Sequence, residues 1–213
     1  MREFEYVPRA EWKPVKDDLV EMIHDIQLVL KYRNSLTFSY SFVGSSKRGM
    51  ITREVNGNRG YDFDIDIRVN DDGEEYSAEE LKDTLRNVID YIGQFHGYEP
   101  GEDSTRVITI KHVDRLASKI LYSCDFAIVN DYSDENDNLR QEFVFFDKES
   151  GQYCWRQRSR EYCNLKQNED RIKAAGKWSE LREVYLEKKC RYSYEKESRA
   201  LYVEAVHEVI SRL

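Results

Sequence analysis

The segment "GYDFDIDIRV", residues 60–69, decides the fold because it alternates like a β-strand and gathers acidic side chains on one face. That face carries Asp62, Asp64 and Asp66. The other face is apolar: Phe63, Ile65, Ile67 and Val69. Carboxylates about 7 Å apart along a strand repel by roughly 2 kcal/mol at an effective dielectric of about 20, and by about 0.6 kcal/mol in bulk water. The acidic face is therefore either open to solvent or occupied by a cation.

The composition is that of a folded protein with a heavily charged surface. Of the 213 residues, 40% are hydrophobic, 13% aromatic and 35% charged, which argues against disorder and allows one core with a small appendage. No apolar run approaches the roughly 20 residues of a membrane helix, and the first residues lack the apolar core of a signal peptide. We therefore expect a cytoplasmic protein without a membrane partner.

The net charge of −8 is unevenly distributed. Residues 151–213 carry 14 Lys or Arg against 10 Asp or Glu, so the rest of the chain carries −12. The overall charge argues against general coating of nucleic acid. The basic end could meet a polyanion, or it could form the solvated face of a helical segment.

The cysteines show no metal-binding pattern. Cys124, Cys154, Cys163 and Cys190 include no C-x-x-C pair, and no histidine spacing completes a zinc site with them. Reduced thiols are expected.

The hydrophobic periodicity predicts an α+β protein. Helical spacing covers residues 17–33, and a strand follows over 36–44. Ser77 lies three residues before Glu80, a capping-box pattern that opens a second long helix. Further strands are predicted from residues 105, 119 and 141, and the pattern turns helical beyond Gly151, with a break at Gly176. We expect a mixed β-sheet flanked by helices, with a helical C-terminal portion.

A glycine-serine turn follows the first predicted strand. Gly44 permits close backbone approach, and Ser45 and Ser46 add hydroxyl groups at a turn whose amides could cradle a phosphate. Lys47 adds positive charge beside them. Such a turn is common in proteins that bind no phosphate, so its meaning depends on the acidic strand that comes after it.

Together, the two segments resemble the signature of the nucleotidyltransferase superfamily, which includes DNA polymerase β, oligoadenylate synthetases, cyclic-dinucleotide synthases and antibiotic nucleotidyltransferases. The signature is an apolar residue and Gly-Ser, a spacer, and then two acidic residues alternating with apolar ones. The matching residues are Val43, Gly44 and Ser45, then Asp62, Phe63, Asp64 and Ile65. The resemblance covers about residues 36–129, and the spacer is several residues longer than usual.

The family also carries a third carboxylate on a later strand, and the strand "KILYSCDFAIV" offers Asp125. Its neighbours are apolar on both faces of that strand. An ionised carboxylate buried there without a partner would cost several kcal/mol or take up a proton. A metal ion would supply the partner; an arginine or backbone amides are the alternative.

The resemblance implies a metal site built from the acidic residues. In the family such carboxylates hold two Mg²⁺ ions, which Mn²⁺ could replace, and carboxylate oxygens are hard ligands suited to Mg²⁺. Two ions about 4 Å apart can activate an attacking hydroxyl and neutralise departing pyrophosphate. Asp62 with Asp64 gives the spacer closer to the family's, and Asp64 with Asp66 remains open. The candidate metal ligands are Asp62, Asp64, Asp66 and Asp125.

The activity implied is transfer of a nucleoside monophosphate from an NTP to an acceptor, which could be a small molecule, RNA or protein. Asp62, Asp64 and Asp125 would be catalytic. The nucleotide would bind at Gly44, Ser45, Ser46 and Lys47. Residues 1–150 would form the catalytic core, and residues 151–213 a helical portion packed on it. The alternative is a catalytically silent nucleotide-sensing or RNA-interacting module of the same fold.

Overall fold

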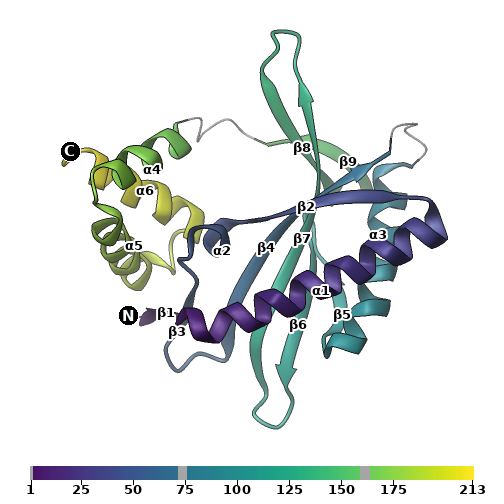
Figure 1. The fold of residues 1–213 in the computed structure, drawn as a ribbon, viewed down its shortest axis with the longest axis horizontal. Helices are drawn as coiled ribbons and strands as arrows, with labels where there is room; N and C mark the ends of the chain where they lie inside the picture. Colours follow the sequence, from purple (N-terminus) through teal and green to yellow (C-terminus); the bar gives the residue numbers. More distant parts are fainter. Residues whose placement is uncertain (1, 72–75, 159–163) are drawn as a thin grey trace. The chain divides into compact units, whose positions relative to one another are not determined.

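The computed structural model of the chain describes residues 2–71, 76–158 and 164–213, which fall into two compact units (Figure 1). Unit 1 comprises residues 1–6, 52–57 and 159–213, and unit 2 comprises residues 7–51 and 58–158. The division differs from a boundary after residue 150 in two respects. The sheet of unit 2 extends through residue 157, and two segments from the first part of the chain belong to unit 1.

Unit 2 is built on a seven-stranded mixed sheet. Its strands run in the order β2, β4, β7, β6, β5, while β8 pairs with the far end of β7 and β9 pairs with β8. Among the strand pairings that the structure describes in this sheet, β4 with β7 is parallel and the others are antiparallel. The strands are β2 (Thr37–Val43), β4 (Arg59–Asn70), β5 (Glu99–Asp103), β6 (Ile108–Asp114), β7 (Lys119–Ser133), β8 (Leu139–Asp147) and β9 (Gln152–Gln157). The expected mixed sheet flanked by helices is confirmed.

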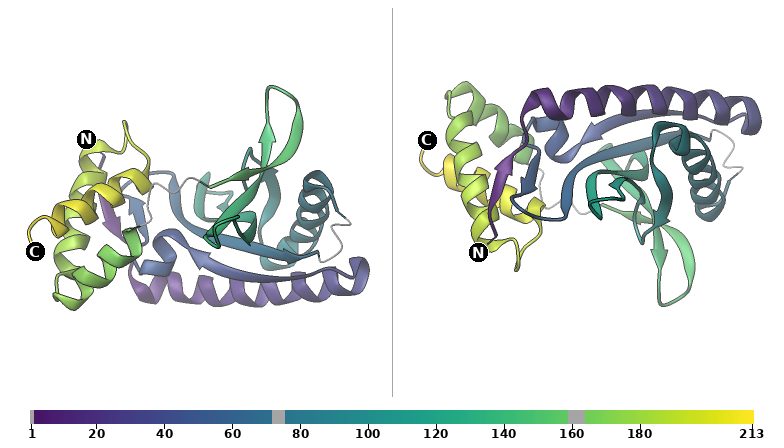
Figure 2. Two further views of the ribbon diagram at one scale, coloured as in Figure 1. Left: turned by 90° about the horizontal axis from the view of Figure 1, so that it is seen from above. Right: turned by 90° about the horizontal axis from the view of Figure 1, so that it is seen from below.

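Two long helices pack on the apolar face of this sheet. In both views of Figure 2, α1 (Arg9–Asn34) runs alongside β2, and it begins eight residues before the expected start because Trp12 and Val15 extend its apolar side. The second helix, α3 (Ala78–Gly93), is followed by the 3₁₀ helix η1 (Gln94–His96). Its predicted capping box is confirmed, since Ser77 and Glu80 exchange both hydrogen bonds. The shared core includes Leu19, Ile23, Ile26, Leu85, Ile89, Phe63, Ile65, Ile110 and Phe126.

One element beyond residue 151 was predicted wrongly. The helical expectation fails for residues 152–157, which form strand β9 paired along β8. Tyr153 and Trp155 pack against the main core, while Cys154 between them packs against an apolar cluster on the other face of the sheet. Apolar residues alternate along this segment as in a strand. Six residues are too few for that alternation to be distinguished from part of a helix.

Unit 1 combines a two-stranded ribbon with three helices. Its strands, β1 (Phe4–Tyr6) and β3 (Thr52–Glu54), pair antiparallel. The Tyr6 hydroxyl donates a hydrogen bond to the Arg182 carbonyl at 2.7 Å, which joins the ribbon to α5. The helices are α4 (Leu165–Ala174), α5 (Trp178–Tyr192) and α6 (Ser198–Ile210). The predicted break at Gly176 is confirmed, because this residue has a φ of +69° between α4 and α5.

The described cysteines are free, and the described helices are not of the membrane-spanning kind. Cys124, Cys154 and Cys190 are free thiols, and Cys163 lies outside the described residues. Among the helices that the structure describes, none combines the length and the apolar character needed to cross a membrane.

Candidate active site

The acidic row of β4 lies on the face of the sheet opposite α1 and α3. Phe63 and Ile65 point into the core beneath those helices, so Asp62, Asp64 and Asp66, which alternate with them, point to the other side. The parallel pairing of β4 with β7 sets Asp64 directly across from Asp125. Cross-strand partners share a face, so the register brings Asp125 to the same face as the acidic row of β4.

Gly44 is shaped around the Asp64 carboxylate. It opens a five-residue helix, α2 (Gly44–Arg48), directly after β2, and its φ is +60°. A Cβ atom on Gly44 would lie 2.1 Å from Oδ2 of Asp64. Both the backbone conformation and this close approach therefore require glycine. The two halves of the predicted motif, the glycine-serine turn and the acidic strand, are in direct contact.

The surroundings of Asp64 disfavour its charged form. Burial raises the pKa of Asp64 to about 6, and the nearby carboxylates of Asp125 and Asp62 add to the shift. The Arg48 guanidinium of α2 acts in the opposite direction and lowers it. A carboxyl group in this state is stabilised by any cation that reaches it.

Asp125 and Asp62 each accept a hydrogen bond from a hydroxyl on a neighbouring strand. Thr109 on β6, the cross-strand partner of Asp125, donates from Oγ1 to Asp125 Oδ1 at 2.6 Å. Burial raises the pKa of Asp125, and the hydrogen bond from Thr109 partly offsets this shift. Asp62 is exposed and accepts from the Ser123 hydroxyl on β7. These two carboxylates are oriented by the sheet itself.

Asp66 is bound directly by an arginine side chain. Arg158, directly after β9, donates from both terminal nitrogens to the two Asp66 oxygens at 2.9 Å each. Asp66 is only 2% exposed. Of the four predicted metal ligands, Asp62, Asp64 and Asp125 are close enough for their charges to interact, whereas Asp66 is closed in a bidentate ion pair with Arg158.

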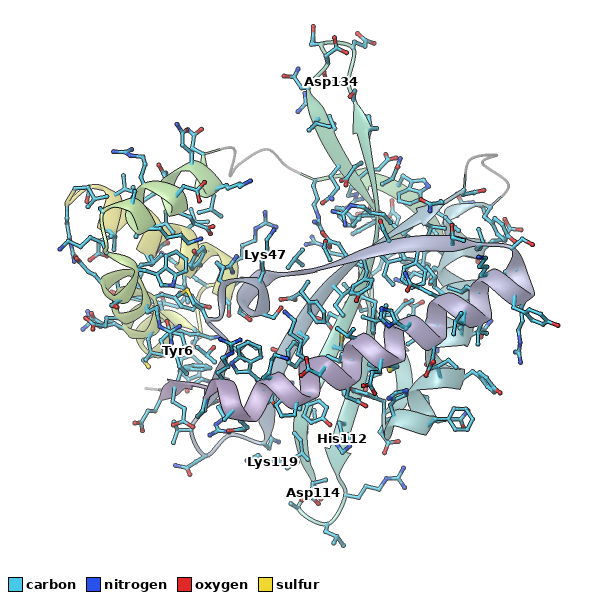
Figure 3. The ribbon with its side chains drawn as sticks, viewed as in Figure 1. Tyr6, Lys47, His112, Asp114, Lys119 and Asp134 are labelled. Carbon is cyan, nitrogen blue, oxygen red and sulfur yellow. The ribbon has the colours of Figure 1, made fainter. Side chains whose placement is uncertain are left out.

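The predicted phosphate-binding residues occupy α2. Ser46 is buried and its hydroxyl donates to the Val43 carbonyl at 2.9 Å, while the Ser45 carbonyl accepts from the Met50 amide at 2.9 Å. Lys47 is exposed and its side chain extends away from α2 (Figure 3). Ser46 thus holds the short helix in place, whereas Lys47 is available to solvent.

Two further acidic residues, Asp114 and Asp134, lie at the hairpins that join β6 to β7 and β7 to β8 (Figure 3). Asp114 accepts from the amides of Leu116 and Ala117 in the turn between β6 and β7. Hydrogen bonds led by the Asn138 side chain hold the pKa of Asp134 well below its usual range. Both carboxylates are used to stabilise turns.

The donor set suits a hard divalent cation without forming a finished site. Asp62, Asp64 and Asp125 supply carboxylate oxygens on one face, and the raised pKa values of two of them reflect charge that a cation would relieve. Within residues 2–71, 76–158 and 164–213, no three acidic, histidine or cysteine side chains already converge closely enough to hold an ion. Metal binding would therefore require these carboxylates to move closer together.

Three residues that sequence reasoning did not assign to the site shape it. Thr109 and Ser123 hydrogen-bond to the aspartates through strand register, for which a single sequence gives no signal. Arg158 follows a segment that was expected to be helical. The position of Arg158 beside the sheet could be predicted only if residues 152–157 were assigned to a strand.

Comparison with known proteins gives matches at the level of structure. No protein-family model matches the chain, and no curated protein matches its sequence. The Elizabethkingia meningoseptica CdnE cyclic dinucleotide synthase, solved with GTP and Apcpp, has a TM-score of 0.53 at 12% identity, over 90% of this chain and 67% of that one. The Vibrio cholerae DncV cyclic AMP-GMP synthase, with the linear intermediate pppA(3′,5′)pG, has a TM-score of 0.57 at 14% identity, over 84% and 48%. Its GTP-bound form gives 0.56 at 15% identity, over 98% and 53%.

The chain therefore spans about half to two thirds of the length of these synthases. At identities of 12 to 15%, the similarity concerns the fold. The resemblance inferred from the motif is confirmed at that level. The chain has the fold of the DNA polymerase β-like nucleotidyltransferase superfamily, to which the cyclic dinucleotide synthases belong.

Proposed function

We propose that this protein is a Mg²⁺-dependent nucleotidyltransferase that moves a nucleoside monophosphate from an NTP to an acceptor and releases pyrophosphate. One observation carries the proposal: Asp64 and Asp125 face each other across paired strands, with Gly44 closed against Asp64. Three separate parts of the chain meet there, and the contact leaves room for no side chain at residue 44. Acidic residues that serve only to stabilise a fold have no need of a second carboxylate opposite them and a glycine packed against them.

The acidic residues would hold the cofactor. Asp62, Asp64 and Asp125 would bind two Mg²⁺ ions, with Mn²⁺ as a substitute, and their oxygen donors fit that choice. When bound, the ions activate the attacking hydroxyl and neutralise the charge of the departing pyrophosphate. Asp66 would remain outside this set because Arg158 occupies both of its oxygens.

The residues of the chain would bind and orient the substrates. Gly44 and Ser45 would bring their backbone close to the triphosphate, Lys47 would add positive charge from the exposed side of α2, and Ser46 would keep α2 in position. Asp125 would accept the proton of the attacking group. Thr109 would keep the Asp125 carboxylate oriented during that transfer. Positioning and electrostatics would then supply most of the catalysis.

The structural neighbours support NTPs as donors. Their structures contain GTP, Apcpp or a linear dinucleotide intermediate, on a fold that this chain shares. The acceptor of this chain is left open among small molecules, RNA and proteins, because the fold similarity covers only part of the synthases.

The test is pyrophosphate release from each of the four NTPs with Mg²⁺, using the same NTPs or fractionated cell extract as the acceptor. The variant Asp64→Asn should lower the rate by about a hundredfold or more, as expected for loss of a group that stabilises charge at the reaction centre. Asp137→Asn is the matched control, because Asp137 lies at the tip of the β7–β8 hairpin with a φ of +56° that asparagine tolerates. It should keep the parental rate.

Two results would contradict the proposal. Full activity of Asp64→Asn would remove the assignment of the site. Stabilisation of the protein by an NTP without pyrophosphate release under any acceptor condition would favour a catalytically silent nucleotide-binding module instead.

A further inference from the structure

We propose that Arg158 is a positioning residue that withholds Asp66 from the metal site, so that Asp62 and Asp64 are the two carboxylates of β4 that bind the ions. The inference rests on the proposed function. It resolves an ambiguity that the sequence leaves open, because three equally spaced aspartates offer two overlapping metal-binding pairs. The two pairs differ by about 7 Å along the strand.

The geometry of the Asp66–Arg158 pair saturates the Asp66 carboxylate. Each oxygen accepts from a different guanidinium nitrogen at 2.9 Å, the fork geometry in which arginine binds carboxylates most specifically. Asp66 has 3% of its side chain exposed, and Arg158 has 32%. An ion approaching Asp66 would have to displace a bidentate partner from a buried carboxylate, whereas Asp62 is exposed and accepts from the Ser123 hydroxyl group.

Gln141 holds Arg158 through both its backbone and its side chain. Its backbone amide donates to the Gln141 carbonyl at 2.8 Å, and its side chain also donates to the Gln141 side-chain oxygen. The Gln141 amide group in turn donates to Asp131 at 2.6 Å, and Asp131 pairs with Arg68 at 2.5 Å. Positive and negative groups therefore alternate through the network, and the guanidinium is fixed before any substrate binds.

Removing the guanidinium should release a competing ligand. A freed Asp66 would add one negative charge about 7 Å from Asp64 on the same face of β4. That charge should increase the attraction for a divalent ion, while drawing it toward the wrong end of the row. Tighter metal binding with slower transfer is a combination that a purely structural ion pair would not produce.

The test compares Arg158→Met, Asp66→Asn and the double variant. Mn²⁺ binding is measured by the loss of its free-ion electron paramagnetic resonance signal, without nucleotide, and pyrophosphate release is measured separately. We expect Arg158→Met to bind Mn²⁺ about tenfold more tightly and to turn over about tenfold more slowly, from the added charge and the shifted ion. The double variant should bind Mn²⁺ within about threefold of the parent, because it removes one charge of each sign and no ligand. Asp66→Asn leaves the Arg158 charge unpaired near the site, so it should weaken Mn²⁺ binding by about tenfold at most, far less than the loss of a ligand in Asp64→Asn.

Arg156→Met is the matched control. Arg156 lies two residues earlier on β9 and stacks on Phe145 with its guanidinium 3.4 Å from the ring centroid. Its removal should leave both Mn²⁺ affinity and turnover close to those of the parent.

Each outcome decides a different question. Loss of Mn²⁺ binding in Asp66→Asn, to the extent seen in Asp64→Asn, would make Asp66 a ligand and overturn the inference. Unchanged Mn²⁺ affinity in Arg158→Met, with equal loss of activity in the double variant, would also overturn it and leave a structural ion pair. If Arg158→Met does not fold, Mn²⁺ binding by Asp66→Asn and by the double variant still decides. Failure of the parent protein to bind Mn²⁺ would instead contradict the proposed function.

Discussion

At the scale of single residues, Gly44 is the position where the backbone and the site constrain each other most. We predict that Gly44→Ala destabilises the protein by more than about 2 kcal/mol, because it combines a left-handed φ with a Cβ 2.1 Å from Asp64 Oδ2. The control is Gly49→Ala at the end of the same short helix, where φ is +66° but nothing lies within 4 Å of the added Cβ. It should cost only about 1 to 2 kcal/mol. Urea unfolding monitored by tryptophan fluorescence measures both, and equal losses would show that the contact with Asp64 is unimportant.

Asp64 should make the metal-free protein less stable at neutral pH than at acidic pH. Its folded pKa of about 6 lies above the unfolded value of 3.8, so the folded state binds its proton more tightly. The resulting penalty is absent below about pH 4, grows between about pH 4 and 6 and is complete above that, where a pKa difference of about two corresponds to about 3 kcal/mol. Asp64→Asn removes the penalty. In EDTA, this variant should therefore unfold at a higher temperature than the parent at pH 8 and at a similar temperature at pH 4. A variant that is less stable at pH 8 would contradict the assigned pKa.

At the scale of elements, the sequence predicted secondary structure well where a periodic pattern extended over many residues, and poorly where a strand was short. The strand carrying Asp62 to Asp66 and the helix opened by Ser77 were predictable, because alternation or a capping box marked each. The residues 152–157 were mistaken for helix because six residues between a glycine and a basic run carry too little pattern. The mistake also hid Arg158, whose position beside Asp66 depends on β9 pairing with β8.

The pairing of Asp64 with Asp125 was predictable in part: the sequence identified the two residues but not the strand register that sets them opposite each other. Both residues could be named from alternation and from the motif, and the resemblance placed them in one site. The parallel register that sets them opposite each other comes from the pairing of β4 with β7, which are 61 residues apart at these positions. Pairings over such separations depend on the packing of the whole sheet against α1 and α3, and a single sequence does not encode them in any local pattern.

At the scale of the whole molecule, the two units differ in charge. By sequence, unit 2, which holds the acidic row, carries a net charge of −9, whereas unit 1 carries +1. A triphosphate is itself strongly negative, so the unit that should bind it repels it at long range, over about a Debye length of 10 Å at 0.1 M salt. On the proposed function, we therefore expect nucleotide binding itself, and not only transfer, to depend on divalent cations.

This imbalance predicts opposite salt effects for the ion and for the free nucleotide. Without metal, a fluorescent ATP or GTP analogue should bind least at low ionic strength, and its binding should improve when KCl is raised, because salt screens the repulsion. With Mg²⁺ present, the analogue should bind, and the Mg²⁺ concentration that gives half-maximal binding should rise with KCl, because salt weakens the attraction of the ion to the acidic face. Fluorescence anisotropy in EDTA and in a Mg²⁺ titration, each at low and at physiological ionic strength, measures both effects. Tight binding in EDTA that weakens with salt would mean that a basic surface, and not the acidic row, recognises the triphosphate.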